Sequence, residues 1–218
     1  MSEILNEVLG TLKLSNTCSL SVGEFSIQLV SKTTKLTAIT VCDCSATGSA
    51  VPRVYSTEIL MAAISDSCSI EEVEGSLKFT HDTDKYTLVN TIQPLLLDFF
   101  TYEIPDEWNT KVIVETEVFK RFVNLQADIE TSIYLSNGIL YFCAENSSST
   151  DVVQISALDI LLEGTDKVTV YFSSLRYLNN LLGLCEKVSI MYTKEYFSVV
   201  LMFKDDVAHH RVIFNGIA

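Results

Sequence analysis

Four short segments of the chain carry apolar residues at helical spacing, and they begin near Glu3, Ser56, Glu117 and Ser174. Within each segment the apolar residues recur three and four positions apart, which predicts a short amphipathic helix with one buried face. Ser56 or Thr57 can cap the second helix. The segments are about fifty to sixty residues apart, a spacing typical of repeated structural units.

The predicted helices divide into an inward apolar face and an outward polar face. The inward positions are Leu5, Val8, Leu9, Leu12, Ile59, Leu60, Ala63, Ile64, Val118, Phe119, Phe122, Val123, Leu175, Leu178, Leu181 and Leu182. The charged outward positions are Lys13, Lys120, Arg121 and Arg176 against Glu3, Glu7, Glu58 and Glu117. These outward charges cancel, although the whole chain has a net charge of −13.

Between the helices lie runs of alternating or β-branched residues, which predict strands. The clearest are KLTAITVC, SLKFT, KYTLVNTIQ, KVIVE, ILYFCAE, DVVQISA and KVTVYF, and Asn137-Gly138 predicts a tight hairpin turn. Short helices on antiparallel sheets, in two similar halves, predict an α+β fold. We place the first domain at 1–94, a connector at 95–109 and the second domain at 110–218.

The stretch YEIPDEW, from Tyr102 to Trp108, lies near the middle of the chain. Pro105 lacks a backbone N–H and restrains Ile104 to an extended conformation, which favours a linker over a helix or a central strand. Taken alone, the segment is compatible with a plain inter-domain loop or with an apolar ribbon on the surface.

Composition limits the possible functions. With 48% hydrophobic and 20% charged residues the chain can bury a core, and no apolar run is long enough to span a membrane. The acidic, amphipathic start MSEILNEVL resembles no targeting peptide, so we expect an intracellular protein. The net charge of −13 argues against binding in a DNA groove, which usually needs a basic surface.

The sequence contains no recognisable catalytic motif and no metal-ligand spacing. The six cysteines form no CxxC pair, and buried free thiols are expected. Asp205, Asp206, His209 and His210 could bind a metal, but their pattern is more typical of a polar turn. We therefore expect no cofactor and no enzymatic activity, with a small metal-dependent enzyme as the alternative from another class.

Three stretches, together with the strand plan, resemble the sliding DNA clamps: proliferating cell nuclear antigen and the phage-type DNA polymerase processivity factors. They are SSLRYLNNLL at 173–182, EIPDEW followed by KVIVETEVFKRF, and ILNEVLGTLK at 4–13. The resemblance covers nearly the whole chain. The chain departs from the family because it begins almost directly with a helix, and because Asn6 and Glu7 stand where a lysine pair is common.

The resemblance implies a ring-forming clamp fold, in which a homotrimer holds duplex DNA topologically and without sequence preference. It implies a processivity factor for replication and repair that docks polymerase and a clamp loader through their short hydrophobic motifs. The expected location is the nucleus in a eukaryote, or the host cytoplasm for a phage or virus. A subunit of a checkpoint clamp and a viral late-transcription clamp remain alternatives.

The resemblance also assigns site residues. The DNA-facing residues would be Lys13, Lys120, Arg121 and Arg176, unless these are ordinary solvated positions. The partner-motif groove would use Val30, Tyr102, Ile104, Pro105, Ile213 and Phe214, although Ile213 and Phe214 are equally compatible with a strand core. Phe99 and Phe100 could belong to the groove or to an interface. The subunit interface would use Tyr86, Leu88 and Asn90 of one copy and Val152, Val153 and Ile155 of the next.

Overall fold

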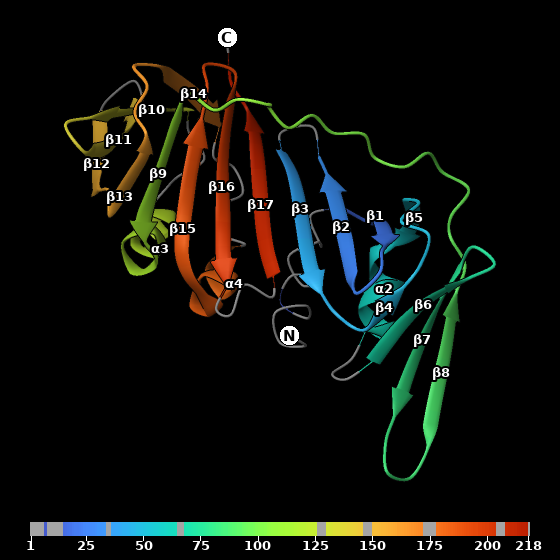
Figure 1. The fold of residues 1–218 in the computed structure, drawn as a ribbon. Helices are drawn as coiled ribbons and strands as arrows, with labels where there is room; N and C mark the ends of the chain where they lie inside the picture. Colours follow the sequence, from blue (N-terminus) through green and yellow to red (C-terminus); the bar gives the residue numbers. More distant parts are fainter. Residues whose placement is uncertain are drawn as a thin grey trace. The chain divides into compact units, whose positions relative to one another are not determined.

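The computed structural model describes residue 7 and residues 15–33, 36–64, 68–125, 130–145, 150–171, 178–203 and 208–217. The chain divides into two compact units (Figure 1). Unit 1 contains Met1–Tyr102 and Asp206–His210, and unit 2 contains Glu103–Asp205 and Arg211–Ala218. The division after Tyr102 falls inside the connector that we placed at 95–109.

Unit 1 contains a run of neighbouring strands, β3-β2-β1-β5, and a four-stranded sheet of order β4-β6-β7-β8. The strands are β1 (Thr17–Val22), β2 (Ser26–Lys32), β3 (Leu36–Asp43), β4 (Ala46–Thr47), β5 (Arg53–Ser56), β6 (Cys68–Val73), β7 (Ser76–Asp82) and β8 (Thr87–Ile92), and helix α2 (Thr57–Ala63) follows β5.

Unit 2 repeats this plan with more strands. One sheet has the order β12-β11-β10-β14, and β13-β9-β15-β16-β17 are successive neighbours in another. The elements are β9 (Thr110–Glu115), α3 (Thr116–Leu125), β10 (Glu130–Ser136), β11 (Ile139–Glu145), β12 (Thr150–Ser156), β13 (Asp159–Leu162), β14 (Lys167–Tyr171), α4 (Asn179–Leu184), β15 (Cys185–Tyr192), β16 (Tyr196–Phe203) and β17 (Ala208–Asn215).

The two units differ at one place in this plan. In unit 2, β9 lies between β13 and β15. In unit 1, β4 pairs directly and in parallel with β6, with Ala46 opposite Ile70. β4 is thus the neighbour of β6, as β9 is the neighbour of β15.

Period-two patterns explain the strands. Along β10, Thr131, Ile133 and Leu135 are buried, and the residues between them are partly exposed. The predicted turn at Asn137-Gly138 is confirmed, because both residues have positive φ (51° and 75°) and Ser136 pairs with Ile139. This is the backbone that a two-residue hairpin of matching twist requires.

The described helices have the predicted buried faces, with two exceptions, Ile59 in α2 and Val118 in α3. In α2, Leu60, Ala63 and Ile64 are buried, and Ser56 is the N-cap. Ile59, which we expected inside, is 51% exposed. Thr57 is buried instead, since its hydroxyl donates to the carbonyl of Ser15 at 2.9 Å and it lies one turn from Leu60.

In the helices of unit 2 the described residues that we expected inside are buried, except for Val118, which is half-buried. Phe119, Phe122 and Val123 of α3 are buried, as are Leu181 and Leu182 of α4. The first predicted helix lies outside the described residues except for Glu7, which is helical. The start of the fourth predicted helix, up to residue 177, also lies outside them.

An aromatic cluster forms the core of unit 2. The ring of Phe122 lies 4.1 Å from that of Phe142 and 5.6 Å from that of Phe119, measured between centroids. Phe197 lies 6.4 Å from Phe142 and 6.0 Å from Phe214. Such contacts hold α3 on the sheets, because packed aromatic pairs stabilise beyond the area they bury.

Candidate functional site

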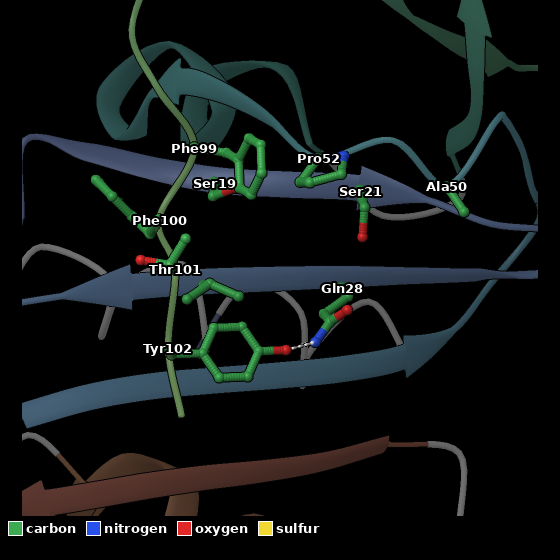
Figure 2. A pocket seen from close by; sticks show the side chains of 10 residues that line it. Ser19, Ser21, Gln28, Ala50, Pro52, Phe99, Phe100, Thr101 and Tyr102 are labelled. Atoms are coloured by element: carbon green, nitrogen blue, oxygen red, sulfur yellow. Dashed lines mark hydrogen bonds between the residues drawn. The ribbon is translucent and has the colours of Figure 1, made fainter. Parts of the chain in front are cut away.

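A pocket of about 300 Å³ lies in unit 1 where the first part of the connector crosses β1 and β2 (Figure 2). Its floor follows from strand periodicity. Leu20 and Val22 face the core, so Ser19 and Ser21 face the opposite side of the sheet. In the antiparallel register Ser19 is opposite Val30 and Ser21 is opposite Gln28, which places all four residues on one face. The complete lining is Ser19, Ser21, Gln28, Val30, Ala50, Pro52, Phe99, Phe100, Thr101 and Tyr102.

Three hydrogen bonds fix the connector on this sheet. The Leu95 N–H donates to the Val54 carbonyl at 2.8 Å. The Lys32 ammonium donates to the Thr101 carbonyl at 2.8 Å, and Gln28 Nε2 donates to the Tyr102 hydroxyl at 2.6 Å. The last bond crosses the pocket floor in Figure 2. The connector wall is therefore anchored to unit 1 from Leu95 to Tyr102.

The loop that carries Ala50 and Pro52 forms the other wall. Gly48 packs on β1 so closely that an added Cβ would lie 2.6 Å from the Val22 carbonyl oxygen. Ala50 has a φ of 59°, and its N–H donates to that same carbonyl at 2.8 Å. Only glycine fits at position 48 without a clash, and the hydrogen bond from Ala50 fixes the loop at the end of β1.

A carboxylate of the neighbouring sheet holds this loop from its other side. Glu72 accepts from the Ser49 N–H (3.0 Å), the Ser49 hydroxyl (2.7 Å) and Arg53 Nε (3.1 Å). The Glu72 side chain is only 7% exposed. Burial alone would raise the pKa of Glu72, but the hydrogen bonds from Ser49 and Arg53 outweigh burial and hold that pKa below its ordinary value.

The chemistry of the pocket suits recognition of a side chain. Its lining has two phenylalanines, a valine and a proline, with hydroxyls and one amide at the floor, and none of these residues is a His, Cys, Asp, Glu or Lys. Such a lining can take up one large apolar side chain and offer hydrogen bonds to the backbone beside it.

The structure brings together only part of the predicted groove. Val30 and Tyr102 line the pocket. Ile104 is 37% exposed and Pro105 is half-buried, and both belong to unit 2. Ile213 and Phe214 are 3% and 1% exposed in unit 2, so their side chains are available to no ligand in this conformation.

Several lining residues were not assigned from the sequence. Phe99 and Phe100, which the sequence left open between groove and interface, both line the pocket. Ser19, Ser21 and Gln28 were missed. Polar and apolar residues alternate along β1, so that one face of the strand is polar and the other is apolar. This alternation could have identified the two serines as residues on the outer face of the sheet.

The predicted interface residues lie on two strands that end their sheets, β8 and β12. On β8, Leu88 is 49% exposed and Asn90 is half-buried, and Tyr86, just before it, is 63% exposed. On β12, Val152 is 48% exposed, Val153 is half-buried and Ile155 is buried at 1%.

Of the predicted DNA-facing residues, Lys120 is half-buried and Arg121 is exposed on α3. Lys13 and Arg176 lie outside the described residues. Helix α3 thus carries two of the four predicted DNA-facing cations, together with the exposed Glu117.

The candidate metal cluster does not assemble among the described residues. His209 is exposed, whereas His210 is fully buried with its Nδ1 2.7 Å from the Thr40 hydroxyl. Burial, with a smaller effect of His209, lowers the pKa of His210 to about 3. Asp205 and Asp206 lie outside the described residues. Within the described part, no group of three or more His, Cys, Asp or Glu side chains is arranged to hold a metal.

No helix in the described part of the chain is long and apolar enough to cross a membrane.

Two solved structures share this fold over nearly the whole chain. A crystal structure of the PCNA2–PCNA3 complex from Sulfolobus tokodaii aligns with a TM-score of 0.73 at 13% sequence identity, covering 99% of this chain and 96% of that one. A crystal structure of proliferating cellular nuclear antigen from Entamoeba histolytica aligns with a TM-score of 0.75 at 10% identity, covering 100% and 96%. The sequence matches no profile of a known protein family and no curated protein. The likeness establishes the sliding-clamp fold, as the sequence predicted.

Proposed function

We propose that this chain is the subunit of a sliding DNA clamp that acts as a polymerase processivity factor. Three copies pair edge to edge into a ring around duplex DNA, and the pocket on unit 1 docks polymerase and other replication and repair proteins. The ring is a scaffold without catalytic activity. The observation that carries the proposal is a pair of open sheet edges, β8 in unit 1 and β12 in unit 2.

These edges have the character of association surfaces. Leu88 and Val89 point to opposite faces of β8, yet they are 49% and 47% exposed. Monomeric proteins normally protect such edges with charges, prolines or bulges. Two different edges on one chain support head-to-tail pairing, which closes into a ring when the rotation between copies allows it.

The strand of unit 1 that corresponds to β12 is β3, and unlike β12 it has a neighbouring strand on both sides. β3 has the place in β3-β2-β1-β5 that β12 has in β12-β11-β10-β14, but β3 has a further neighbour, β17, whereas β12 ends its sheet. Residues Ala208–His210 belong to unit 1 and lie beside β3, where His210 contacts Thr40. Among the described residues no strand pairs with the outer side of β12. The pairing of β3 supports β12 as the edge that a second copy would use.

Helix charges support a weak, sliding contact with DNA. The predicted outward faces sum to about zero in a chain of net charge −13. A lining that is far less acidic than the rest of the protein permits non-specific phosphate contacts without holding the duplex tightly.

The oligomeric state tests the proposal directly. The chain mass of 24.3 kDa predicts a species of about 73 kDa by light scattering. Leu88→Lys and Val152→Lys should each give monomers, because a buried unpaired charge would oppose strand pairing. Ile59→Lys, on the 51% exposed position of α2, is the matched control and should stay trimeric. Unaltered trimers in both edge variants would contradict the assigned edges.

A processivity assay then separates the functions. With a cognate polymerase and loader on primed circular DNA, the trimer should lengthen the products. A heteromeric ring is the second candidate, because one structure of this fold is a complex of two different subunits, PCNA2 and PCNA3. A chain that stays monomeric alone but forms a ring with another clamp-fold protein would favour that candidate.

A further inference from the structure

One face of the sheet β12-β11-β10-β14 in unit 2 carries a row of side chains that runs across all four strands. The strand register places in this row, from β12 to β14, Gln154, Tyr141, Tyr134 and Lys167. The row faces away from the core, because the residues that alternate with it along the strands, such as Phe142, are buried. The rings of Tyr134 and Tyr141 are stacked, with centroids 5.0 Å apart and planes at 8°. We call these four residues the tyrosine row.

The composition of the tyrosine row suits an interaction surface. Tyrosine is enriched at protein interfaces because its ring is apolar and its hydroxyl can form hydrogen bonds. Lys167 is exposed and is the only charged member of the row. The residues two positions away on the same face are uncharged, namely Ser132, Ser136, Ile139, Cys143, Val152, Ser156 and Thr169. A carboxylate that approaches this face therefore meets a cation among neutral side chains.

The acidic residues nearest to the row are distant or already paired. Glu130, on the same face of β10, is four residues from Tyr134, which is about 13 Å along the strand. Asp166 precedes Lys167 in the chain, but its carboxylate lies 3.7 Å from the Lys194 ammonium, with which it forms an ion pair. The row is thus a neutral to basic surface on a chain of net charge −13.

Unit 1 repeats this sheet and shows what lies on the equivalent face. The order β5-β1-β2-β3 matches the order β14-β10-β11-β12, and all of these neighbours are antiparallel. When the buried positions of the strands are matched, Tyr134 corresponds to Ser21 and Tyr141 corresponds to Gln28. Ser21 and Gln28 belong to the pocket floor in Figure 2. The tyrosine row is therefore the counterpart, in unit 2, of the surface that the connector crosses in unit 1.

The chain also reaches the two faces through equivalent hydrogen bonds. Leu95 follows β8 and donates its N–H to the Val54 carbonyl on β5 at 2.8 Å. Ile217 follows β17 and donates its N–H to the Thr169 carbonyl on β14 at 2.7 Å. Val54 and Thr169 occupy equivalent places, since the pairing of β5 with β1 matches the pairing of β14 with β10. Each unit therefore directs the chain onto this face at the same point.

In unit 1 the segment beyond this point lies across the face. The connector has the sequence LLLDFFTY at 95–102, and Tyr102 accepts a hydrogen bond from Gln28 Nε2 at 2.6 Å. This segment is apolar and aromatic, with Asp98 as its one charged residue. In unit 2 Ile217 is the last described residue, and the members of the tyrosine row are half-buried or exposed. Unit 1 thus supplies, within the same chain, an example of a segment that suits this face.

We propose that the tyrosine row binds an extended segment of a partner protein that carries one aromatic side chain and one carboxylate, as the connector lies on the equivalent face of unit 1. The aromatic side chain packs on Tyr134 and Tyr141, and the carboxylate pairs with the Lys167 ammonium. Neighbouring strands are about 4.8 Å apart, so the two partner residues are about two to three positions apart in an extended segment. Pairing of β12 with a second copy uses its backbone edge and leaves these side chains accessible.

Peptide selection with a depletion step tests the proposal. A displayed library of random peptides is depleted on the double variant Tyr134→Ser, Tyr141→Gln and is then selected on the wild type. The variant carries the residues of the equivalent positions in unit 1, so its sheet should stay folded, which circular dichroism checks. We expect the selected peptides to combine an aromatic residue with Asp or Glu at the stated spacing.

Titration of the selected peptides, labelled with a fluorophore, assigns the roles. Tyr141→Gln should weaken binding about tenfold or more, as loss of a central aromatic anchor does. Lys167→Glu should weaken binding and reduce its salt dependence, because the cation that faces the carboxylate is reversed. Lys187→Glu, whose side chain is 52% exposed on β15, is the matched control and should bind as the wild type does. Tyr102→Glu, in the pocket of unit 1, should also leave this binding unchanged.

The contrary outcomes are specific to this surface. Depletion that removes every binder of the wild type would overturn the proposal, as would selected peptides that are basic or lack an aromatic residue. Equal loss of affinity with Lys167→Glu and Lys187→Glu would show a general charge effect and overturn the role of Lys167. An oligomer larger than the trimer that disappears with Tyr141→Gln would assign the row to a second copy instead. Failure of the ring or of processivity stimulation would contradict the proposed function alone, because the peptide titration does not depend on either.

Discussion

Glu72 offers a sharp test of how the pocket wall is built. Its carboxylate accepts three hydrogen bonds, two from Ser49 and one from Arg53, while its side chain is 7% exposed. Ser49 lies in the same loop as Ala50, which lines the pocket. Glu72→Gln keeps the size of the side chain, but it removes the charge and turns an N–H₂ group toward donors.

The expected loss follows from these contacts. A hydrogen bond to a charged group contributes about 1.5–3 kcal/mol. The Arg53 side chain is 37% exposed, so solvent screens its share, and the two bonds from Ser49 dominate. We expect the variant to lose about 2 kcal/mol of the free energy of unfolding, which lowers Tm by about 4–8 °C in a chain of this length.

The pH dependence identifies the cause. Because the folded-state pKa of Glu72 lies below the ordinary 4.5, its contribution is fully present above pH 4.5 and is lost as pH falls through the folded-state value. The stability gap between wild type and Glu72→Gln should therefore shrink below pH 4.5. Thermal denaturation followed by circular dichroism from pH 7 to pH 3 measures it.

Glu71→Gln is the matched control. Glu71 is the next residue along β6, but its side chain is 52% exposed and its 3.4 Å ion pair with Lys78 lies on the surface. Exposed pairs contribute about 0–1 kcal/mol, so this variant should be nearly neutral. An equal loss in both variants, or a gap for Glu72→Gln that does not change with pH, would refute the reasoning.

Two further predictions concern single residues, and a third concerns a pair of neighbouring cations. Gly48→Ala should destabilise by about 1–3 kcal/mol in urea titrations, since its Cβ would lie 2.6 Å from the Val22 carbonyl oxygen; an unchanged midpoint would contradict the packing. The pKa of His210 is about 3 in the folded protein, against an ordinary value of 6.5. The free energy of unfolding of the wild type should therefore fall by about 1.4 kcal/mol for each unit that the pH is lowered between those values, and His210→Gln should remove this slope. Lys120→Glu with Arg121→Glu should weaken non-specific DNA contact and flatten its salt dependence by about one to two in log–log slope, and an unchanged slope would place these residues away from DNA.

Local sequence pattern was sufficient for most of the secondary structure. The hairpin at Asn137-Gly138 follows from two residues that tolerate positive φ, and the buried face of α3 follows from the spacing of Phe119, Phe122 and Val123. Ile59 was misplaced because a short helix offers two overlapping apolar stripes. The hydrogen bonds from Thr57 to Ser15 and Asn16, about forty residues away in the chain, favour the stripe that buries Thr57.

The sequence pointed to the connector as a candidate groove, and the pocket is lined by part of that connector. The apolar character of the connector and the proline in YEIPDEW marked an extended surface strip. Phe99, Phe100 and Tyr102 line the pocket, whereas Ile213 and Phe214 are buried. A run of apolar residues in a strand looks the same whether it lines a pocket or fills a core, since both require β-forming apolar side chains.

The sequence by itself determined most of the elements, the repeat of two similar halves and the acidic charge that argues against groove binding, because these depend on local propensity and composition. Only the tertiary structure decided which serines of β1 form the pocket floor, which carboxylate holds its wall, and that β8 and β12 are edges. Those facts depend on strand register and strand order, which join residues far apart in the chain and leave no local periodicity to read.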